Sequence, residues 1–468
     1  MSICEKELRF GLVERISEIL ERAEVAEADL SYGEDDGSER NRKKSGSYYT
    51  PVDVARYFWD EFFRLRGLND ASTTRDFLCA HDFIEPAVGA GALFFALLEK
   101  LLRNGLDSSD ISVIRASVFD INSRALDFVK KQIRIIEKAE GVKFKNIKYK
   151  NADFISSPKL RLSGHAMVFG NPPFVANKKY ESRWKNKYAD FLERALNMSG
   201  ETGSVSFIVP FSIAFSRDYL GLRSKLVIEN RLVALSSFDN IPDALFKFGK
   251  PKSVNTNKAN SQRCTIVSSI PSCKRKVIST RLNRWARGER SKVLSAPSKY
   301  YDVTGFSFEG QIIRPANSMV SSYIKATYGR CLTIGDLVKE DGLYVLNVAA
   351  VARNYLGFRE DSSSSVVALR FSRKSDFYRI LSVIASDLFF DYWLTVGDGF
   401  HVTKSNIYKF PLHDAVLGGA NEYIGAAKRM WELRKRYAKV KINAGLIAES
   451  YDFSGEVPSF YPLIKKIR

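Results

Sequence analysis

The amino-acid sequence predicts a doubly wound α/β domain built on a parallel sheet, followed by a second domain of mixed α+β structure. Three observations lead to this prediction. Between residues 82 and 270, short apolar runs alternate with stretches of helical periodicity. Glycine, asparagine or aspartate follows several of these runs, at the strand ends where open parallel sheets bind their ligands. After about residue 275 the alternation ends, and aromatic and charged residues interleave.

The individual elements of the first domain follow from this alternation. The expected strands are 83–85, 111–119, 147–150, 166–169, 204–209, 232–238 and 264–268. The expected helices lie between them, at 93–103, 123–139, 188–197 and 220–229. An amphipathic helix at 5–27 is expected to pack on this domain, because leucine or isoleucine recurs every four positions from Leu8 to Leu20. The basic segment 422–441 is expected to form a helix near the C-terminus.

Length and charge set the broad class of the protein. A chain of 468 residues is too long for one ordinary domain. We expect an N-terminal helical extension at 1–40, one domain at 41–275 and another at 276–468. Lysine and arginine exceed aspartate and glutamate by 72 to 53, which gives a net charge of +19 and indicates a polyanionic partner. Without a run of 18 uncharged apolar residues, no membrane span is expected, so nucleic acid is the better candidate.

Cysteine and histidine usage argues against a metal centre. The five cysteines show no paired spacing, and only four histidines are present. We therefore expect no metal site, and the odd number of cysteines suits reduced thiols in a cytoplasm. The first residues lack a basic stretch followed by an apolar one, so the expected location is cytoplasmic.

A glycine-containing segment from Glu85 to Gly91 follows the first expected strand and opens a helix. Gly89 and Gly91 permit a tight turn and close approach of a ligand, although an ordinary strand-to-helix turn uses the same pattern. Asp120 ends the next strand, where it can bind both hydroxyls of a ribose, and Asp153 follows a third, where it can receive an adenine amino group. The leading acid favours a cationic cofactor, and S-adenosylmethionine carries both an ammonium and a sulfonium group.

The tetrapeptide Asn171-Pro172-Pro173-Phe174 directly follows the expected strand at 166–169 and Gly170. Asn171 offers a carbonyl oxygen, and Pro172 has no N–H, so its backbone can only accept a hydrogen bond. Phe174 supplies a flat face on which a base can stack, a contact worth about 1–3 kcal/mol. An amino group whose hydrogens point at two carbonyls becomes more nucleophilic. A stiff turn is the alternative for an isolated tetrapeptide, but its place after the glycine segment and the two strand-end acids favours catalysis.

In content and order, these motifs resemble the N6-adenine DNA methyltransferases of the gamma arrangement, from residue 46 to about residue 265. The resemblance implies a Rossmann-like, S-adenosylmethionine-dependent methyltransferase fold. It implies catalysis by Asn171, Pro172, Pro173 and Phe174. It implies that the cofactor is bound by Tyr49, Thr50, Pro51, Glu85, Pro86, Gly89, Gly91, Asp120, Asp153 and Asn171. The family's aromatic residue beside the target base falls at Phe238 or Phe246, and the insertion at 250–262 leaves both open.

The resemblance also implies roles for the domains. It makes 41–275 the catalytic domain and 276–468 a DNA target-recognition domain, in which 280–285 and 391–411 look like segments of such regions in restriction-system enzymes. The function it implies is methyl transfer to N6 of an adenine flipped out of a specific double-stranded DNA sequence. Restriction-modification or phage defence is the expected setting, and a separate restriction or defence subunit is an open question.

Two other functions stay open at this point. One is a catalytically silent DNA-binding scaffold of a defence complex, although the joint presence of Glu85, Asp120, Asp153 and Asn171 argues against it. The other is an RNA or protein amino-group methyltransferase, since Asn-Pro-Pro-aromatic also occurs in those enzymes. They are usually compact and lack a large basic C-terminal part.

Overall fold

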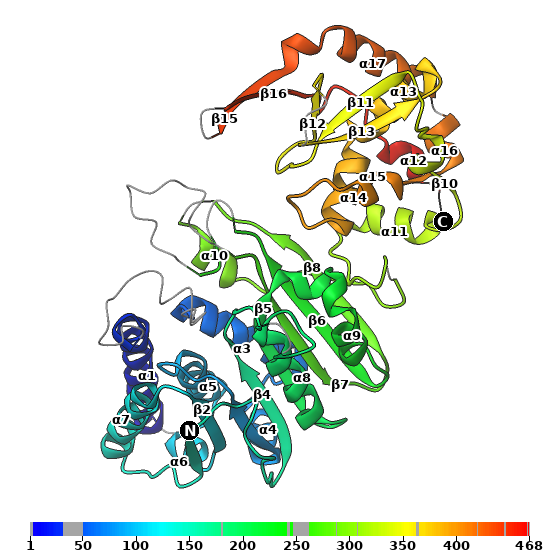
Figure 1. The fold of residues 1–468 in the computed structure, drawn as a ribbon. Coiled ribbons are helices and arrows are strands. Elements are labelled where there is room, and N and C mark those ends of the chain that lie inside the picture. The colour runs from blue at the N-terminus through cyan, green and yellow to red at the C-terminus, as the bar shows by residue number, and fades with distance from the viewer. Residues whose placement is uncertain are drawn as a thin grey trace. The chain divides into compact units, whose positions relative to one another are not determined.

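A computed structural model of the chain describes residues 3–30, 50–178, 181–240, 244–246, 262–286, 288–306, 308–361, 365–418, 420–443, 446–465 and 467. The chain divides into two compact units, Met1–Gly305 and Phe306–Arg468. Each unit has its own sheet and its own helices, and we describe each by itself (Figure 1).

The first unit is built on a nine-stranded sheet, counted over the described residues. Its strands are β1 (His81–Glu85), β2 (Arg115–Asp120), β3 (Ile147–Asn151), β4 (His165–Gly170), β5 (Ser204–Pro210), β6 (Arg231–Phe238), β7 (Cys264–Pro271), β8 (Lys276–Asn283) and β9 (Tyr300–Asp302). The spatial order is β3-β2-β1-β4-β5-β7-β6-β8-β9. Strands β1 to β5 run parallel, and β7 is inserted antiparallel between β5 and β6. The order reverses between β1 and β4, which makes the carboxyl ends of these strands a switch point for ligand binding.

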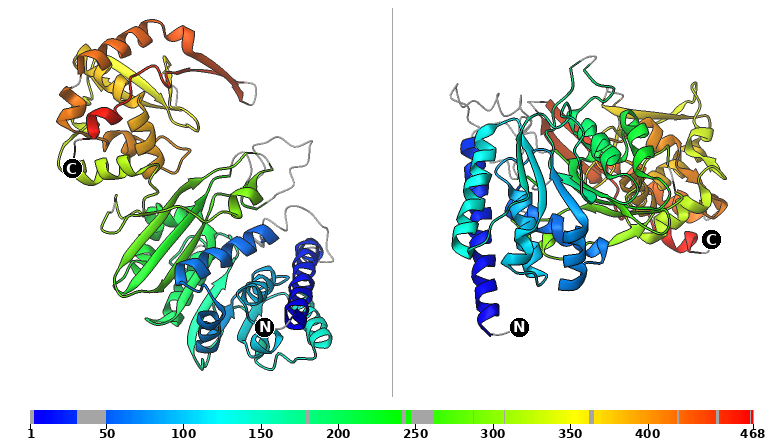
Figure 2. Two further views of the ribbon diagram at one scale, coloured as in Figure 1. Left: turned by 180° about the vertical axis from the view of Figure 1, so that it is seen from behind. Right: turned by 90° about the horizontal axis from the view of Figure 1, so that it is seen from below.

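Helices cover both faces of this sheet (Figure 2). They are α1 (Ile3–Leu30), α3 (Val52–Arg66), α4 (Ala71–Ala80), α5 (Ala92–Arg103), α6 (Ser108–Ser112), α7 (Ser123–Glu140), α8 (Lys187–Ser199), α9 (Leu220–Leu226) and α10 (Arg290–Leu294). One group consists of α3, α5 and α7 with α1 packed on α5 and α7, and the other consists of α8 and α9, with α8 against β4 and β5. The leucine and isoleucine stripe predicted for α1 is buried from Leu12 to Leu20. The predicted doubly wound methyltransferase-type fold with a mixed α+β second unit is confirmed.

The division between the units lies thirty residues beyond the expected boundary at 275, after Gly305. The reason is that β8 pairs in parallel with β6, and β9 pairs with β8, so both strands extend the first sheet. Residues 280–283 of the expected recognition segment therefore lie in β8 of the first unit.

The second unit combines an antiparallel sheet with short helices. Its sheet has the order β13-β11-β12-β16-β15, with β11 (Tyr344–Ala349), β12 (Gly357–Arg359), β13 (Val366–Phe371), β15 (Ala438–Asn443) and β16 (Leu446–Asp452). A two-stranded ladder joins β10 (Leu332–Thr333) and β14 (Pro411–Leu412). The helices are α11 (Ser318–Thr327), α12 (Ile334–Leu337), α13 (Lys374–Ile384), α14 (Asp387–Val396), α15 (Lys404–Tyr408), α16 (Asp414–Gly418), α17 (Ala420–Glu432) and α18 (Tyr461–Ile464).

The prediction of a basic helix over 422–441 is wrong in its second half. Helix α17 ends at Glu432, a 3-10 turn follows at Arg434–Tyr437, and the chain then enters β15. The β-branched residues Val440 and Ile442 alternate with lysines at this point, a period-two pattern that suits a strand. The strand is completed by antiparallel pairing with β16, which begins three residues after β15 ends.

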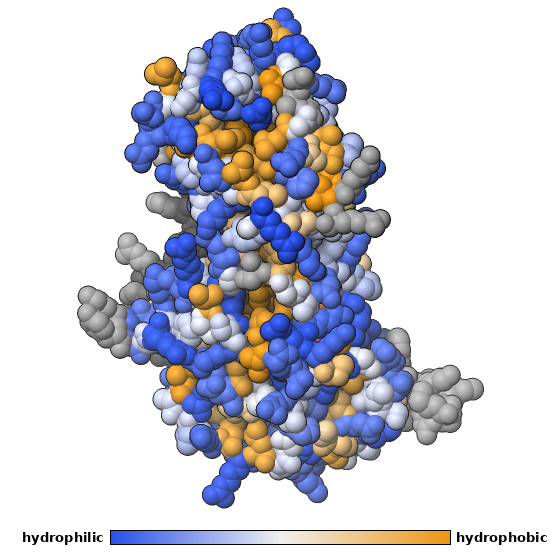
Figure 3. Space-filling model, turned by 90° about the vertical axis from the view of Figure 1, so that its right-hand side faces the viewer, coloured by the Kyte–Doolittle hydropathy of each residue, from blue (hydrophilic) through white to orange (hydrophobic). Residues whose placement is uncertain are grey.

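Hydrophilic residues cover most of the face shown in Figure 3, with smaller apolar patches between them. Among the described helices, none is both long enough and apolar enough to cross a membrane.

Candidate active site

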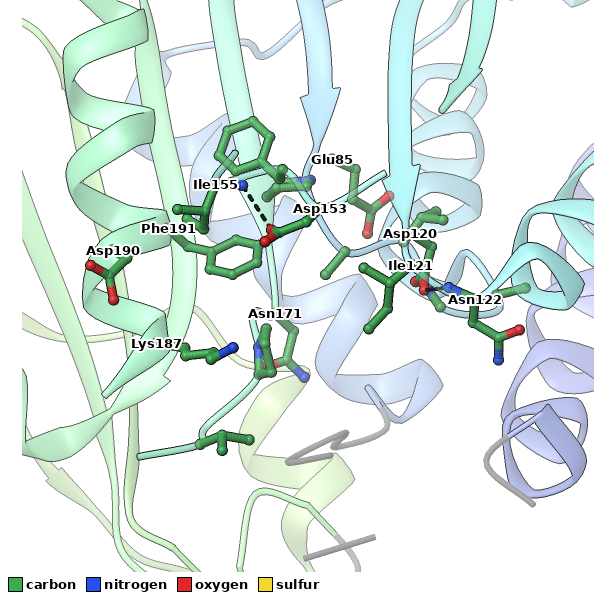
Figure 4. Close-up of a pocket in the computed structure, with 18 of the residues that line it drawn as sticks. Glu85, Asp120, Ile121, Asn122, Asp153, Ile155, Asn171, Lys187, Asp190 and Phe191 are labelled. Atoms are coloured by element: carbon green, nitrogen blue, oxygen red, sulfur yellow. Dashed lines mark hydrogen bonds between the residues drawn. The ribbon is translucent and has the colours of Figure 1, made fainter. Parts of the chain in front are cut away.

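A cavity of about 600 Å³ lies at the carboxyl ends of β1, β2 and β4, beside the turn that follows β3. It brings together most of the residues predicted from sequence to form one site: Thr50, Glu85, Pro86, Gly89, Asp120, Asp153, Asn171 and Pro173. Figure 4 labels Glu85, Asp120, Asp153 and Asn171 among them. Four further predicted residues, Pro51, Gly91, Pro172 and Phe174, do not line it. Tyr49 lies outside the described residues.

Asp120 organises the turn after β1. Its two carboxylate oxygens accept hydrogen bonds from the backbone N–H groups of Gly89, at 2.9 Å, and Asn122, at 2.8 Å. Gly89 has a φ of 52°, a left-handed conformation that glycine adopts without strain. Burial raises the pKa of the Asp120 carboxyl above its usual value, and the hydrogen bonds from Asn122 and Gly89 act in the opposite direction. Each oxygen has a second lone pair with which to bind a ligand hydroxyl.

Gly91 serves packing and not the lining of the cavity. It precedes α5 with a φ of 85°, and a Cβ at this position would lie 2.8 Å from Cε2 of Phe95 and 3.1 Å from Cγ2 of Val129. Glycine is therefore required for two reasons, its backbone conformation and the close approach of two apolar side chains.

The acidic residues differ in exposure. Glu85, at the end of β1, is only 2% exposed, whereas Asp153, after β3, is exposed. The carboxylate of Asp153 accepts a 2.9 Å hydrogen bond from the backbone N–H of Ile155, drawn as a dashed line in Figure 4. This bond orients the carboxylate at the start of the turn after β3.

Asn171 begins the tetrapeptide that follows β4 and joins two predicted motifs. Its side-chain Nδ2 donates a hydrogen bond of 3.1 Å to the hydroxyl of Thr50, which is itself 5% exposed. The bond fixes the plane of the amide and directs Oδ1 away from Thr50. Thr50 immediately precedes Pro51, the residue that caps α3, so the end of β4 and the start of α3 meet at the cavity.

Phe174 lies behind this wall in an aromatic cluster. It is 6% exposed and meets the rings of Tyr188 and Phe246 edge-on, with centroids 6.4 and 6.2 Å away. Of the two aromatic residues left open by the sequence, Phe246 is thus the neighbour of Phe174. Phe238 packs instead against Tyr57 and Trp285.

Several lining residues were not found from the sequence. Ile121 directly follows Asp120, lines the cavity and is 79% exposed, which is unusual for an isoleucine. Phe191 stacks on Phe154 with a centroid distance of 5.7 Å. Two features of the sequence could have indicated these residues. Ile121 is an apolar residue directly after a strand-end acid, and Phe191 lies in the first turns of an expected helix.

A second wall of the cavity comes from the segment after the tetrapeptide and the start of α8. Asp190 accepts hydrogen bonds from Nδ2 of Asn177, at 2.7 Å, and from the hydroxyl of Ser182, at 2.5 Å. Lys187 and Glu181, also in the lining, form an ion pair of 3.4 Å. Over the described residues, no three His, Cys, Asp or Glu side chains gather in a way that would hold a metal ion.

In the second unit, the segment Gly397–His401 forms a tight loop organised by Asp398. Its carboxylate accepts from the backbone N–H groups of Phe400, at 2.8 Å, and His401, at 2.7 Å, and lies 2.6 Å from Nδ1 of His401. The guanidinium of Arg353 sits over the Phe400 ring, 5.3 Å from its centroid. This loop presents a histidine whose side chain is 60% exposed.

Comparison with known proteins relates the first unit to restriction-modification methylases. Residues 92–242 match the model of the Eco57I restriction-modification methylases. The chain is also 26% identical over 250 residues to the Type II methyltransferase M.VspI of Vibrio sp. (strain 343). The aligned region covers 52% of this chain and 53% of that protein. The chain therefore spans about half the length of the curated relative that it matches. Both similarities are to restriction-modification methylases.

Solved structures of restriction-modification proteins resemble the chain only distantly. The Type IIL enzyme MmeI in complex with DNA has 12% identity and a TM-score of 0.49, over 92% of this chain and 76% of that one. A modification subunit of a putative type I restriction enzyme from Vibrio vulnificus YJ016 has 13% identity and a TM-score of 0.39, over 58% of this chain and 60% of that one.

Proposed function

We propose that this protein transfers a methyl group from S-adenosylmethionine to N6 of an adenine flipped out of a specific double-stranded DNA sequence, as part of a restriction-modification or phage-defence system. The observation that carries the proposal is the hydrogen bond between Asn171 and Thr50 in the lining of the cavity. It joins the catalytic tetrapeptide to the segment expected to bind the methionine end of the cofactor, beside the acidic strand ends.

The residues of the cavity fit S-adenosylmethionine chemically. Asp120 has lone pairs for two ribose hydroxyls, and Glu85 and Asp153 supply negative charge for the ammonium and adenine amino groups. Ile121 and Phe191 offer apolar surface for the purine ring. When bound, the cofactor supplies an electrophilic methyl group on its sulfonium sulfur.

The tetrapeptide performs the rest of the proposed chemistry. The Asn171 side-chain oxygen and the Pro172 carbonyl accept hydrogen bonds from N6 and stabilise the positive charge that develops there. Phe174 is assigned to stack on the extruded adenine, which requires its ring, 6% exposed in this structure, to become accessible. Flipping the base costs a few kcal/mol. Holding N6 in line with the methyl group supplies much of the acceleration. A strong general base is not required, since the methylated nitrogen can release its proton to water.

The net charge of +19 supports DNA as the substrate, because binding through phosphates needs an excess of lysine and arginine. We assign target recognition to the second unit, where the loop Gly397–His401 and the hairpin of β15 and β16 are the candidate elements. Lys439 in β15 and Arg436 in the 3-10 turn just before it are both exposed. A separate restriction or defence subunit belongs to the same proposal.

Substitution of Asn171 by alanine tests the proposal. The Asn171→Ala variant is expected to bind S-adenosylmethionine with little change in calorimetry and to transfer less than about 1% of the tritiated methyl groups that the wild type transfers, because an acceptor of the developing charge is lost. Asn104→Ala, which removes a half-buried amide that does not line the cavity, is the matched control and should keep the wild-type rate. Full activity of Asn171→Ala on DNA contradicts the assignment.

The wild-type protein separates the remaining alternatives. Long-read sequencing of DNA from cells with and without the protein should show N6-methyladenine within one sequence motif. A protein that binds DNA but shows no calorimetric signal with S-adenosylmethionine is a scaffold. Transfer to RNA or protein, and not to DNA, supports the third function.

A further inference from the structure

Arg290, at the start of α10, is a buried arginine that the proposed chemistry does not use. Its side chain is 6% exposed. Nη2 and Nε donate to the two carboxylate oxygens of Asp53, at 2.7 and 2.9 Å, and Nη1 donates to the backbone carbonyl of Leu245 at 2.8 Å. The guanidinium thus holds a carboxylate with one edge and a backbone carbonyl with another, an arrangement that its planar set of donors permits and that a lysine cannot reproduce.

The first partner leads to the cofactor side of the site. Asp53 lies in the first turn of α3, three residues after Thr50, whose hydroxyl accepts the hydrogen bond from Asn171. Ser291 donates a further bond of 2.7 Å to the same carboxylate. The start of α3 is therefore joined both to α10 and to the catalytic tetrapeptide.

The second partner leads to the aromatic cluster. Leu245 directly precedes Phe246, the edge-on neighbour of Phe174. The residues Ala244, Leu245 and Phe246 are 7%, 0% and 3% exposed, so this short segment is packed inside the first unit. The bond from Arg290 to the Leu245 carbonyl is one residue away from the ring that borders Phe174.

We propose that Arg290 is a positioning residue for the base-binding side of the site. By bonding Asp53 and the Leu245 carbonyl together, it fixes Phe246 beside Phe174 and at a constant distance from Thr50 and Asn171. The nature of the ligand, an extruded base, rests on the function proposed above. Positioning matters at this point because a displacement of about 1 Å in a catalytic site can lower the rate by a factor of about 100.

A suitable control lies at the opposite end of the strands. Arg115, the first residue of β2, donates to Asp82 at 3.2 Å and to the backbone carbonyls of Cys79 and His81 at 2.8 and 3.1 Å. It therefore resembles Arg290 in bonding one carboxylate and neighbouring carbonyls, but it is remote from the cavity. Arg115→Met measures the general cost of removing such an arginine.

Amide hydrogen exchange of the full-length protein tests positioning without any need for activity. Arg290→Met is expected to speed exchange in the peptide that contains 244–246 by about tenfold or more, whereas Arg115→Met leaves this peptide unchanged. Unchanged exchange in Arg290→Met, or an equal increase in both variants, overturns the proposal.

Single-turnover methyl transfer tests the consequence for the reaction. Arg290→Met and Phe246→Ala are each expected to reduce the rate by about 10- to 100-fold while cofactor affinity changes less than about threefold. In the Phe246→Ala background the further effect of Arg290→Met is expected to fall below about threefold, because Arg290 acts through Phe246. Arg290→Lys should recover little of the rate, since it keeps the charge but not the fork of donors.

The outcomes distinguish this inference from the proposed function. Effects of Arg290→Met and Phe246→Ala that multiply in the double variant overturn the positioning role. A wild type that methylates no DNA overturns the proposed function, while the exchange measurement still decides whether Arg290 holds the segment 244–246.

Discussion

Replacing Asp120 by asparagine tests the cofactor assignment most directly. In the structure each carboxylate oxygen accepts one backbone N–H, from Gly89 and from Asn122, and keeps a lone pair for a ribose hydroxyl. Asparagine has only one acceptor oxygen, so the substitution removes one charge-assisted bond to the ribose. It also places the side-chain NH₂ group against a backbone N–H, and two donors cannot form a hydrogen bond with each other. A hydrogen bond to a charged group contributes about 1.5–3 kcal/mol, so the Kd for S-adenosylmethionine should rise about 10- to 150-fold.

Isothermal titration calorimetry measures this Kd. Repeating the titration at several pH values tests whether binding requires the charged Asp120 carboxylate. Because burial raises the pKa of Asp120, its carboxylate becomes protonated at a higher pH than an exposed aspartate does. Cofactor binding to the wild type is therefore expected to weaken as the pH falls through this raised pKa, and binding to Asp120→Asn should lack that dependence. For the free protein the sign is opposite, since a raised pKa adds stability at low pH that is lost as the pH rises through it.

Asp127→Asn is the control for this experiment. Asp127 is exposed on α7, pairs with Lys130 at 3.3 Å and does not line the cavity. Its substitution should leave the Kd within about twofold, as expected for a surface ion pair. A Kd for Asp120→Asn as close to the wild type as this would refute the reasoning.

Two further predictions concern stability and DNA binding. Gly91→Ala should lower the unfolding temperature more than Gly141→Ala does. Both glycines have positive φ, but only at position 91 would the new Cβ also lie 2.8 Å from the Phe95 ring. Strain of this kind costs about 1–3 kcal/mol, and scanning calorimetry compares the two variants. Arg436→Gln and Lys439→Gln should each reduce the slope of log Kd against log salt for duplex DNA by about 1. Fluorescence anisotropy measures these slopes, and unchanged slopes would show that the hairpin does not contact DNA.

The strand-end residues were predictable because the carboxyl ends of parallel strands meet at one edge of the sheet. Glu85, Asp120 and Asn171 each follow an apolar run, and the structure gathers them around one cavity. Their neighbours were harder to predict. Nothing in the local sequence tells an exposed Ile121 from a buried isoleucine, and Phe191 reaches the cavity only through the packing of α8 on β4 and β5.

Contacts between residues distant in the sequence explain the remaining differences between the predictions and the structure. The choice between Phe238 and Phe246 depends on how the segment after β6 returns to the site, which the sequence around the insertion does not specify. The end of helix α17 was missed because the lysines of 435–441 suit a helix equally well until the pairing of β15 with β16 is considered. In each case the deciding contact is with a residue distant in the sequence or on another element.

The pairing of β8 with β6 bears on how this protein can be re-engineered. If the second unit recognises DNA as proposed above, exchanging it for a unit of different specificity requires a junction after Gly305. A junction at residue 275 would remove β8, β9 and Arg290, and would leave β6 as an open edge available to other chains. Hybrids joined there are expected to aggregate and to lose the contact that holds Phe246, whatever DNA sequence their new unit recognises.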